Sequence, residues 1–215
     1  MMSHFLLLPL IFIFNVGHAG STAAPSPTIE VQKSIESKNI SDFNAAIKKL
    51  KSVNEVLNEK NETALMLAAR GEFSRGMLAL LKNGADPLLE NSDHKNSILI
   101  SLESALCSES AMMIKNLSDK ATNEQLTAMA QKSVSVNCPD AIKALSKKTD
   151  LKKIRDASGE NLLMSSVEAG SPDLVKLLLK LGFSAQEKSE KTGDTAIERA
   201  KKLGYRTVLK TLEKK

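Results

Sequence analysis

The chain has 215 residues, with 30 Lys and Arg against 25 Asp and Glu and a formal net charge of +5. This length allows one continuous domain or at most two small ones. With no Trp and one Tyr, the chain lacks the aromatic side chains on which nucleic-acid bases stack. Two cysteines cannot build a disulfide scaffold. The composition therefore argues against nucleic-acid binding and leaves side-chain packing as the main source of stability.

The chain begins with an apolar segment, residues 5–14. It is too short to span a bilayer, which needs roughly 20 apolar residues, but it fits the hydrophobic region of a secretory signal peptide. Small residues acceptable to signal peptidase follow at 17–19 and again at 21–23, although no Lys or Arg precedes the apolar run. We predict a signal peptide over residues 1–19, cleaved after Ala19. The mature protein is then periplasmic and has no stable membrane insertion.

Residues 20–28 consist mainly of Ser, Thr, Ala and Pro. Such small residues cannot bury enough surface to become ordered, so this segment is predicted to be a flexible leader. The folded domain is expected to cover residues 29–215.

Within that domain the sequence repeats itself. The segment 61–69 has counterparts at 159–164 and 193–197, and the segment 137–143 is followed 33 residues later by a similar one at 170–176. A fixed period of this kind indicates a stack of similar structural units.

Each unit is predicted to be two short helices. Thr63 and Thr195 can cap a first helix by accepting from a free backbone N–H, and the pair 68–69, both Ala, lets a neighbouring helix approach closely. Isolated glycines mark the chain reversals. Those between the helices of a unit are Gly71, Gly170 and Gly204, and those after a second helix are Gly84 and Gly182.

These residues resemble the ankyrin repeat, whose first helix opens Thr-Pro-Leu-His-x-Ala-Ala. The matches are Thr63, Leu65, Ala68, Ala69 and the Gly-Ala-Asp ending at 84–86, with Ala64 and Met66 in place of Pro and His. The resemblance covers nearly all of the mature chain. It implies an all-α solenoid of helix-turn-helix units joined by hairpin-like finger loops.

The period predicts six units, beginning near residues 32, 61, 95, 123, 159 and 193. The first is expected to lack a complete first helix, and both end units look like the polar caps that a stacked array needs. The units at 95 and 123 keep the apolar spacing but lose the motif. Finger loops are expected near 58–63, 86–96, 150–160 and 184–194.

Catalytic chemistry is not indicated. His94 is the one histidine of the mature chain, and in a finger loop a solvated residue is more plausible than a catalytic base. A zinc site needs about four closely spaced ligands, which the sequence does not offer, and it has no Gly-rich phosphate loop. We therefore predict a protein that is not an enzyme and has no cofactor, no metal and no catalytic residues.

The two cysteines, Cys107 and Cys138, fall near the inter-helix turns of adjacent units. Packed helices lie about 8 to 10 Å apart, whereas a disulfide needs Cα atoms about 4.4 to 6.8 Å apart. A disulfide and a pair of small buried thiols therefore remain alternatives.

The resemblance implies that partners bind at the finger tips and the adjoining face of the first helices. Eight residues are expected to be exposed at or beside this interface: Met66, Leu88, Glu90, Asn91, Asp93, Lys95, Glu187 and Lys188. A second feature is a group of basic residues in and after the fourth unit, which either forms a solvated surface or steers an acidic partner towards the protein. Its members are Lys143, Lys147, Lys148, Lys152, Lys153 and Arg155.

The predicted function is binding of another exported protein by a chain that is monomeric when free. By architecture and compartment the chain resembles exported bacterial ankyrin proteins of the immunity or self-protection type, which inhibit peptidoglycan hydrolases such as endopeptidases. This makes a periplasmic inhibitor the first hypothesis. The alternatives are a scaffold or accessory factor for a periplasmic enzyme, for example in oxidative-stress protection, and an effector directed at a host cell.

Overall fold

A computed structural model describes residues 25–117 and 120–213 of the chain. Within these residues the regular structure is α-helical, apart from one short 3-10 helix, Leu151–Lys153, and three isolated β-bridges. The helices are α1 (Pro27–Glu36), α2 (Ile40–Ile47), α3 (Ala64–Arg70), α4 (Ser74–Lys82), α5 (Ser97–Glu103), α6 (Cys107–Lys115), α7 (Asn123–Ser135), α8 (Pro139–Leu145), α9 (Leu162–Glu168), α10 (Pro172–Lys180), α11 (Ala196–Lys202) and α12 (Arg206–Glu213).

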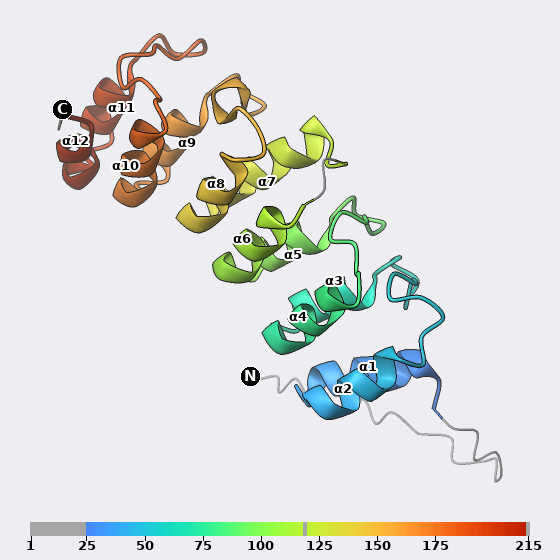
Figure 1. Ribbon diagram of the computed structural model, residues 1–215. Helices are drawn as coiled ribbons and strands as arrows, with labels where there is room; N and C mark the ends of the chain where they lie inside the picture. Colours follow the sequence, from blue (N-terminus) through green and yellow to red (C-terminus); the bar gives the residue numbers. More distant parts are fainter. Residues whose placement is uncertain (1–24, 118–119, 214–215) are drawn as a thin grey trace, which may run out of the picture.

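Consecutive helices pair into six units that stack side by side in one curved array (Figure 1). The first helices of neighbouring units pack against each other, as do several of the second helices, so the array has two rows. The predicted all-α solenoid of six units is confirmed. None of the described helices has the length and apolar character needed to cross a membrane.

Side-chain caps define where the first helices begin. The Thr63 hydroxyl accepts from the Met66 N–H, and Thr195 accepts from the N–H of Glu198. Asn96 and Asn161 do the same for α5 and α9. Each such bond satisfies one of the backbone donors that a helix start leaves free. The predicted caps Thr63 and Thr195 are therefore confirmed.

The turn between the two helices of every unit contains one residue with positive φ. These residues are Lys38, Glu72, Ala105, Asn137, Gly170 and Gly204, about one repeat apart. Gly71 is thus not the turn residue that the sequence suggested: it ends α3 at φ −78°, and Glu72 takes the left-handed conformation. A Cβ on Gly71 would lie 2.7 Å from Cγ2 of Ile35, so this glycine permits close contact between units.

The start of the domain differs from the prediction. Helix α1 begins at Pro27, and the Ser26 side chain caps it by accepting from the Ile29 N–H. The end of the segment expected to be a flexible leader, residues 20–28, is therefore helical, and the first unit has a complete first helix of 10 residues. Proline at the first helical position costs no hydrogen bond. The predicted signal peptide, residues 1–19, lies outside the described residues.

Finger loops connect the units at the four predicted places. Isolated antiparallel bridges close three of them, Val56 with Thr63, Arg155 with Asn161 and Lys188 with Thr195, and a backbone bond from Asn91 to Lys95 closes the fourth. The link from α6 to α7 is different, because it runs only from residue 116 to 122. Helix α7 has 13 residues, against 7 in each of α3, α5, α9 and α11.

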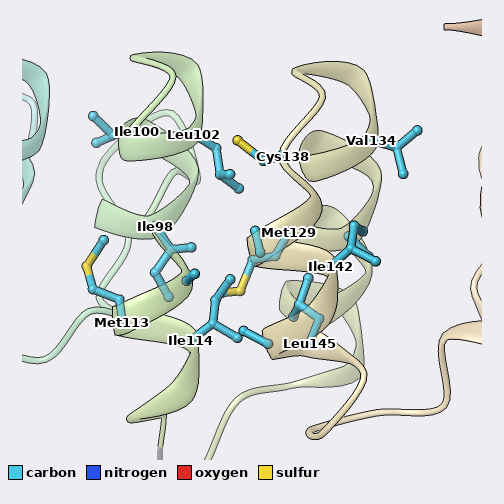
Figure 2. Packing of buried hydrophobic residues seen from close by; sticks show 14 of the residues in the cluster. Ile98, Ile100, Leu102, Met113, Ile114, Met129, Val134, Cys138, Ile142 and Leu145 are labelled. Carbon is cyan, nitrogen blue, oxygen red and sulfur yellow. The ribbon is translucent and has the colours of Figure 1, made fainter. Parts of the chain in front are cut away.

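The core runs continuously through the array between the two rows of helices. Figure 2 shows the part of it between the third and fourth units, where Leu102 and Ile114 lie towards Met129 and Leu145. All four side chains are fully buried. Because one unit alone would leave such faces exposed to water, burial between neighbours is the main source of stability.

The third and fourth units are also joined covalently. Cys107 and Cys138 form a disulfide with their Cα atoms 5.4 Å apart. This is closer than the usual separation of packed helices, and both cysteines stand directly at the starts of α6 and α8. Small buried residues on these helices, Ala111 and Ala141 among them, favour the close approach.

Leu178 tests the register of the array. This side chain on α10 is fully buried, and we expect Leu178→Ala to lower the free energy of unfolding by about 2 to 5 kcal/mol, because the site leaves a cavity. Urea unfolding followed by circular dichroism measures the change. Lys176→Ala on the exposed side of the same helix is the control and should stay within about 0.5 kcal/mol. An unchanged melting temperature in Leu178→Ala would contradict the packing described.

Removing the disulfide tests how much this link contributes. Since the bond closes a loop with a sequence separation of 31 residues, Cys107→Ala with Cys138→Ala should lower the free energy of unfolding by about 3 to 4 kcal/mol. Urea unfolding with and without reductant measures it, and the reduced wild type should behave like the double variant. Equal stability of the oxidised and reduced wild type would show that the bond does not constrain the unfolded chain.

Candidate functional site

A groove lies between the finger loop at 86–96 and the start of α7. Its first part is a cavity of about 350 Å³, lined by Glu90, His94, Asn96, Leu99, Thr122, Glu124, Gln125 and Ala128. Leu99 and Ala128 are half-buried and give it an apolar floor, while Glu90 and Glu124 are exposed at its edge. The groove therefore combines an apolar base with two carboxylates.

A second cavity, of about 390 Å³, continues the groove towards the other ends of α5 and α7. It shares Leu99 and Ala128 with the first. At this end Glu103 pairs with Lys95 at 2.8 Å and with Lys132 at 3.3 Å. Burial raises the pKa of Glu103, but hydrogen bonds from the two lysines outweigh it and hold the pKa below its ordinary value. Two cations and one anion thus surround this end.

One wall of the groove comes from the early start of α7, which has 13 residues where α3, α5, α9 and α11 have 7, an excess of roughly one and a half turns. Thr122 and Gln125 form a reciprocal capping box at its first turn. The Gln125 side chain also reaches the preceding finger, donating to the carbonyl oxygen of Leu88 at 3.3 Å and to the Glu90 carboxylate at 2.8 Å. The extra turns of α7 stand where the other units carry a finger, and they form one wall of the groove.

The interface residues that the sequence predicts on this finger differ in their exposure to solvent. Glu90 and Asp93 are exposed, whereas Leu88 and Lys95 are half-buried. Asn91 is 4% exposed, which contradicts its prediction as an exposed residue. Its Oδ1 accepts from the N–H groups of Asp93 and Lys95 and so shapes the loop from inside.

The three remaining predicted residues lie outside the groove. Met66 is 1% exposed, so its prediction as an interface residue is wrong: this apolar side chain points into the core from α3, and the neighbouring Leu67 is the half-exposed one. Glu187 and Lys188 are exposed, but they belong to the last finger, where Glu187 pairs with Arg155 at 3.2 Å.

The sequence did not single out Leu99, Gln125, Ala128 and Lys132 as site residues. The available signal was the Thr-x-x-Gln spacing at 122–125, which is typical of a capping box. That spacing predicts a helix start at residue 123, the same position near which the period places the fourth unit. Together with the missing finger, it would have identified the wall of the groove.

The candidate metal ligands and the one histidine considered in the sequence analysis lie apart from the groove or at its exposed edge. The part of the chain that the structure describes contains no cluster of three or more His, Cys, Asp or Glu side chains able to hold a metal ion. His94 lies at the finger tip with its side chain 91% exposed and its Nδ1 3.8 Å from the Glu90 carboxylate, in agreement with the solvated loop residue expected from the sequence.

The basic residues around the fourth unit divide into two groups. Lys148 and Arg155 have protein partners, the carbonyl oxygen of Leu117 at 2.7 Å and the carboxylate of Glu187 respectively. Lys143, Lys147, Lys152 and Lys153 are exposed.

A buried ionic network joins the last two units. Arg199 on α11 is 7% exposed and donates to Asp194 at 2.7 Å, Glu160 at 3.1 Å and Glu168 at 2.5 Å. The hydrogen bond from Arg199 holds the pKa of Asp194 well below its usual range. The Arg199 pKa is raised, chiefly by the hydrogen bond to Asp194. Because the partners come from two adjacent units, we interpret the network as a structural link.

Comparison with known proteins agrees with this architecture. Residues 126–215 match the model of ankyrin repeats, described as three copies. Structures of similar shape include the ankyrin repeat protein EF0377, with a TM-score of 0.69 and 21% identity over 85% of this chain and 96% of that one. The fold is an ankyrin-repeat solenoid. No curated protein matches the sequence.

Two further structural matches come from named bacteria. One is an ankyrin repeat domain from Acinetobacter baumannii, with a TM-score of 0.69 and 19% identity over 85% of this chain and 95% of that one. The other is a chain in the structure of Bd0816, a predatory endopeptidase from Bdellovibrio bacteriovorus, in complex with the immunity protein Bd3460. It gives a TM-score of 0.67 and 22% identity, covering 86% of this chain and 97% of that one.

An ankyrin-repeat array is an interaction module, because stacked units expose an extended concave surface and a row of loop tips. In this chain that surface carries the groove between α5 and α7. The ankyrin fold therefore supports a protein-binding role, for which the groove is a candidate site.

The ionic network generates a prediction about acid stability. Because the pKa of Asp194 is lower in the folded protein than in the unfolded chain, its stabilising effect is complete above the unfolded value of about 3.9 and is lost as the pH falls below it. We expect Asp194→Asn to cost about 1 to 3 kcal/mol near neutral pH and less in acid. Urea unfolding of the wild type and the variant, once near neutral pH and once below the unfolded pKa of about 3.9, measures this difference. A cost independent of pH would argue against the Asp194–Arg199 pairing.

Proposed function

We propose that this ankyrin-repeat chain is exported and inhibits an exported peptidoglycan hydrolase, such as an endopeptidase, so that the producing cell is protected. The observation that carries the proposal is the shared fold with a chain of the complex between an endopeptidase and its immunity protein. At 22% identity this likeness concerns the fold, and the assignment of a partner is our inference.

The form of the molecule is compatible with inhibition. An inhibitor must keep its shape when it covers an active site, because ordering a flexible surface reduces affinity. The groove lies at the joint between the third and fourth units, where a disulfide links α6 to α8 and Gln125 links α7 to the finger. A binding surface there is pre-organised.

Export is the first part of the proposal to test. We expect the protein recovered from the periplasm to lack residues 1–19, or a few residues more, and to carry the Cys107–Cys138 bond, because that compartment is oxidising. Intact-mass measurement with and without reductant determines both. Soluble cytoplasmic protein that retains residues 1–19 would overturn the compartment and, with it, the hydrolase as target.

Inhibition is tested with a purified partner. The mature chain is used for affinity capture from periplasm, and the captured hydrolase is then purified and assayed on peptidoglycan. We expect cleavage to fall to near zero at close to equal molar amounts. Reversing two finger charges, Glu90→Lys with Asp93→Lys, should weaken inhibition. Because Glu90 also accepts from Gln125, the melting temperature of the variant is measured in parallel to verify that it is folded.

The control reverses two exposed charges on and after the outer helix α8, Lys143→Glu with Lys147→Glu. Normal inhibition by this variant supports the finger side as the interface. Loss of inhibition in this variant alone would move the interface to the basic outer surface. A captured enzyme whose activity is unchanged or increased would replace the inhibitor by a scaffold. Deleting the gene should harm cells that make the hydrolase.

A further inference from the structure

We infer that the groove between α5 and α7 binds an extended segment of a protein partner, with a Lys or Arg side chain of that segment beside Glu90 and Glu124. This inference rests on the proposed role as a protein-binding inhibitor and specifies which part of a partner the array recognises. It depends on the shape of the groove, its charges and one buried donor.

The shape favours an extended chain over a helix. The groove runs between the first helices of two neighbouring units, and packed helices lie about 8 to 10 Å apart. A helix with its side chains is about 10 to 12 Å wide and would rest on the rims. An extended strand directs alternate side chains to one side, so it can place every second side chain against the floor formed by Leu99 and Ala128.

On one side of the groove the wall is the first part of α7 rather than a finger loop. At other joints a finger loop of the following link stands beside the first helices, whereas the link from α6 to α7 spans only residues 116–122. A segment that crosses the array can therefore enter over α7. The bonds from Gln125 to Leu88 and Glu90 keep the opposite wall in place.

The charges determine what the segment must carry. Two carboxylates, Glu90 and Glu124, border the finger end. His94 lies near Glu90, but Glu124 forms no ion pair with any residue that the structure describes. An anionic group would be repelled here, whereas a cationic side chain gains a partner.

The buried donor is the side-chain amide of Asn96. Asn96 is fully buried and lines the finger end of the groove. Its Oδ1 caps α5, while its Nδ2 has no acceptor among the described residues. A buried donor without a partner is costly, and a small shift of the Asn96 amide towards the groove would let a backbone carbonyl oxygen of an inserted segment accept from it.

The test selects peptides from a displayed library on the full mature protein and then measures the selected peptides one by one. We expect the selected sequences to be enriched in Lys or Arg and a synthetic copy to bind with one-to-one stoichiometry. Glu124→Gln should weaken its binding about three- to fivefold, the effect of one partly exposed ion pair. Glu213→Gln, the same change at an exposed position on α12, should leave binding unchanged.

A second variant tests the floor independently of charge. Ala128→Phe fills the part shared by both cavities. It should weaken peptide binding at least about tenfold, because the larger side chain occupies the space that the segment needs. Circular dichroism and the melting temperature verify that the variant is folded. Amide chemical shifts of Leu99, Gln125 and Lys132 should change on titration with the peptide.

The inference is overturned if the selected peptides are acidic, if no peptide is enriched, or if folded Ala128→Phe binds as well as the wild type. Chemical-shift changes confined to α8 would also overturn it. These outcomes leave the proposed function standing when the purified hydrolase is still inhibited. Conversely, peptide binding in the groove together with an unaffected hydrolase would reject the inhibitor and keep the groove as a peptide site.

Discussion

Burial of apolar faces between neighbouring units is the interaction on which the rest of this structure depends. Met129 and Leu178, for example, are fully buried because neighbouring units of the array cover them. This requirement explains the left-handed turns at Lys38, Glu72 and Ala105. Such a conformation costs a non-glycine residue roughly 1 to 2 kcal/mol, and the packing of the two helices that it connects offsets this cost. The packing of the array thus outweighs the backbone preference of the individual turn residues.

The joint between the third and fourth units departs from this regularity in a concerted way. The link before α7 is shorter than the other links between units, α7 is longer than the other first helices, and a disulfide connects the starts of α6 and α8. With so short a link, the third and fourth units meet through contacts other than those of two neighbouring finger loops. The disulfide and the bond from Gln125 to Glu90 restrain them on the two sides of the joint. A binding site must be accessible to its partner and keep its shape. The short link allows access here, and the disulfide and the Gln125–Glu90 bond keep the shape.

The sequence predicted the architecture well because the repeat determines it at many positions. The caps Thr63 and Thr195 and the glycines after the second helices, Gly84 and Gly182, behave as expected. The details of the site were less predictable, because they arise where the pattern is broken. Met66 illustrates this: sequence position placed it on the first-helix face, but whether it or Leu67 faces the core depends on the neighbouring unit. The cysteines illustrate it again, since average helix spacing could not tell that α6 and α8 approach closely.

The two polar clusters of the molecule show why burial alone does not identify a binding site. Around Arg199 every strong charge is already paired within the protein, and its partners Glu160 and Asp194 are buried with it. A ligand there would have to replace good hydrogen bonds and would gain little. At the finger end of the groove, Glu124 is exposed beside an apolar floor, and the Nδ2 of Asn96 lacks an acceptor among the described residues. A partner can supply both missing interactions there, so we propose the groove rather than the ionic network as the recognition surface.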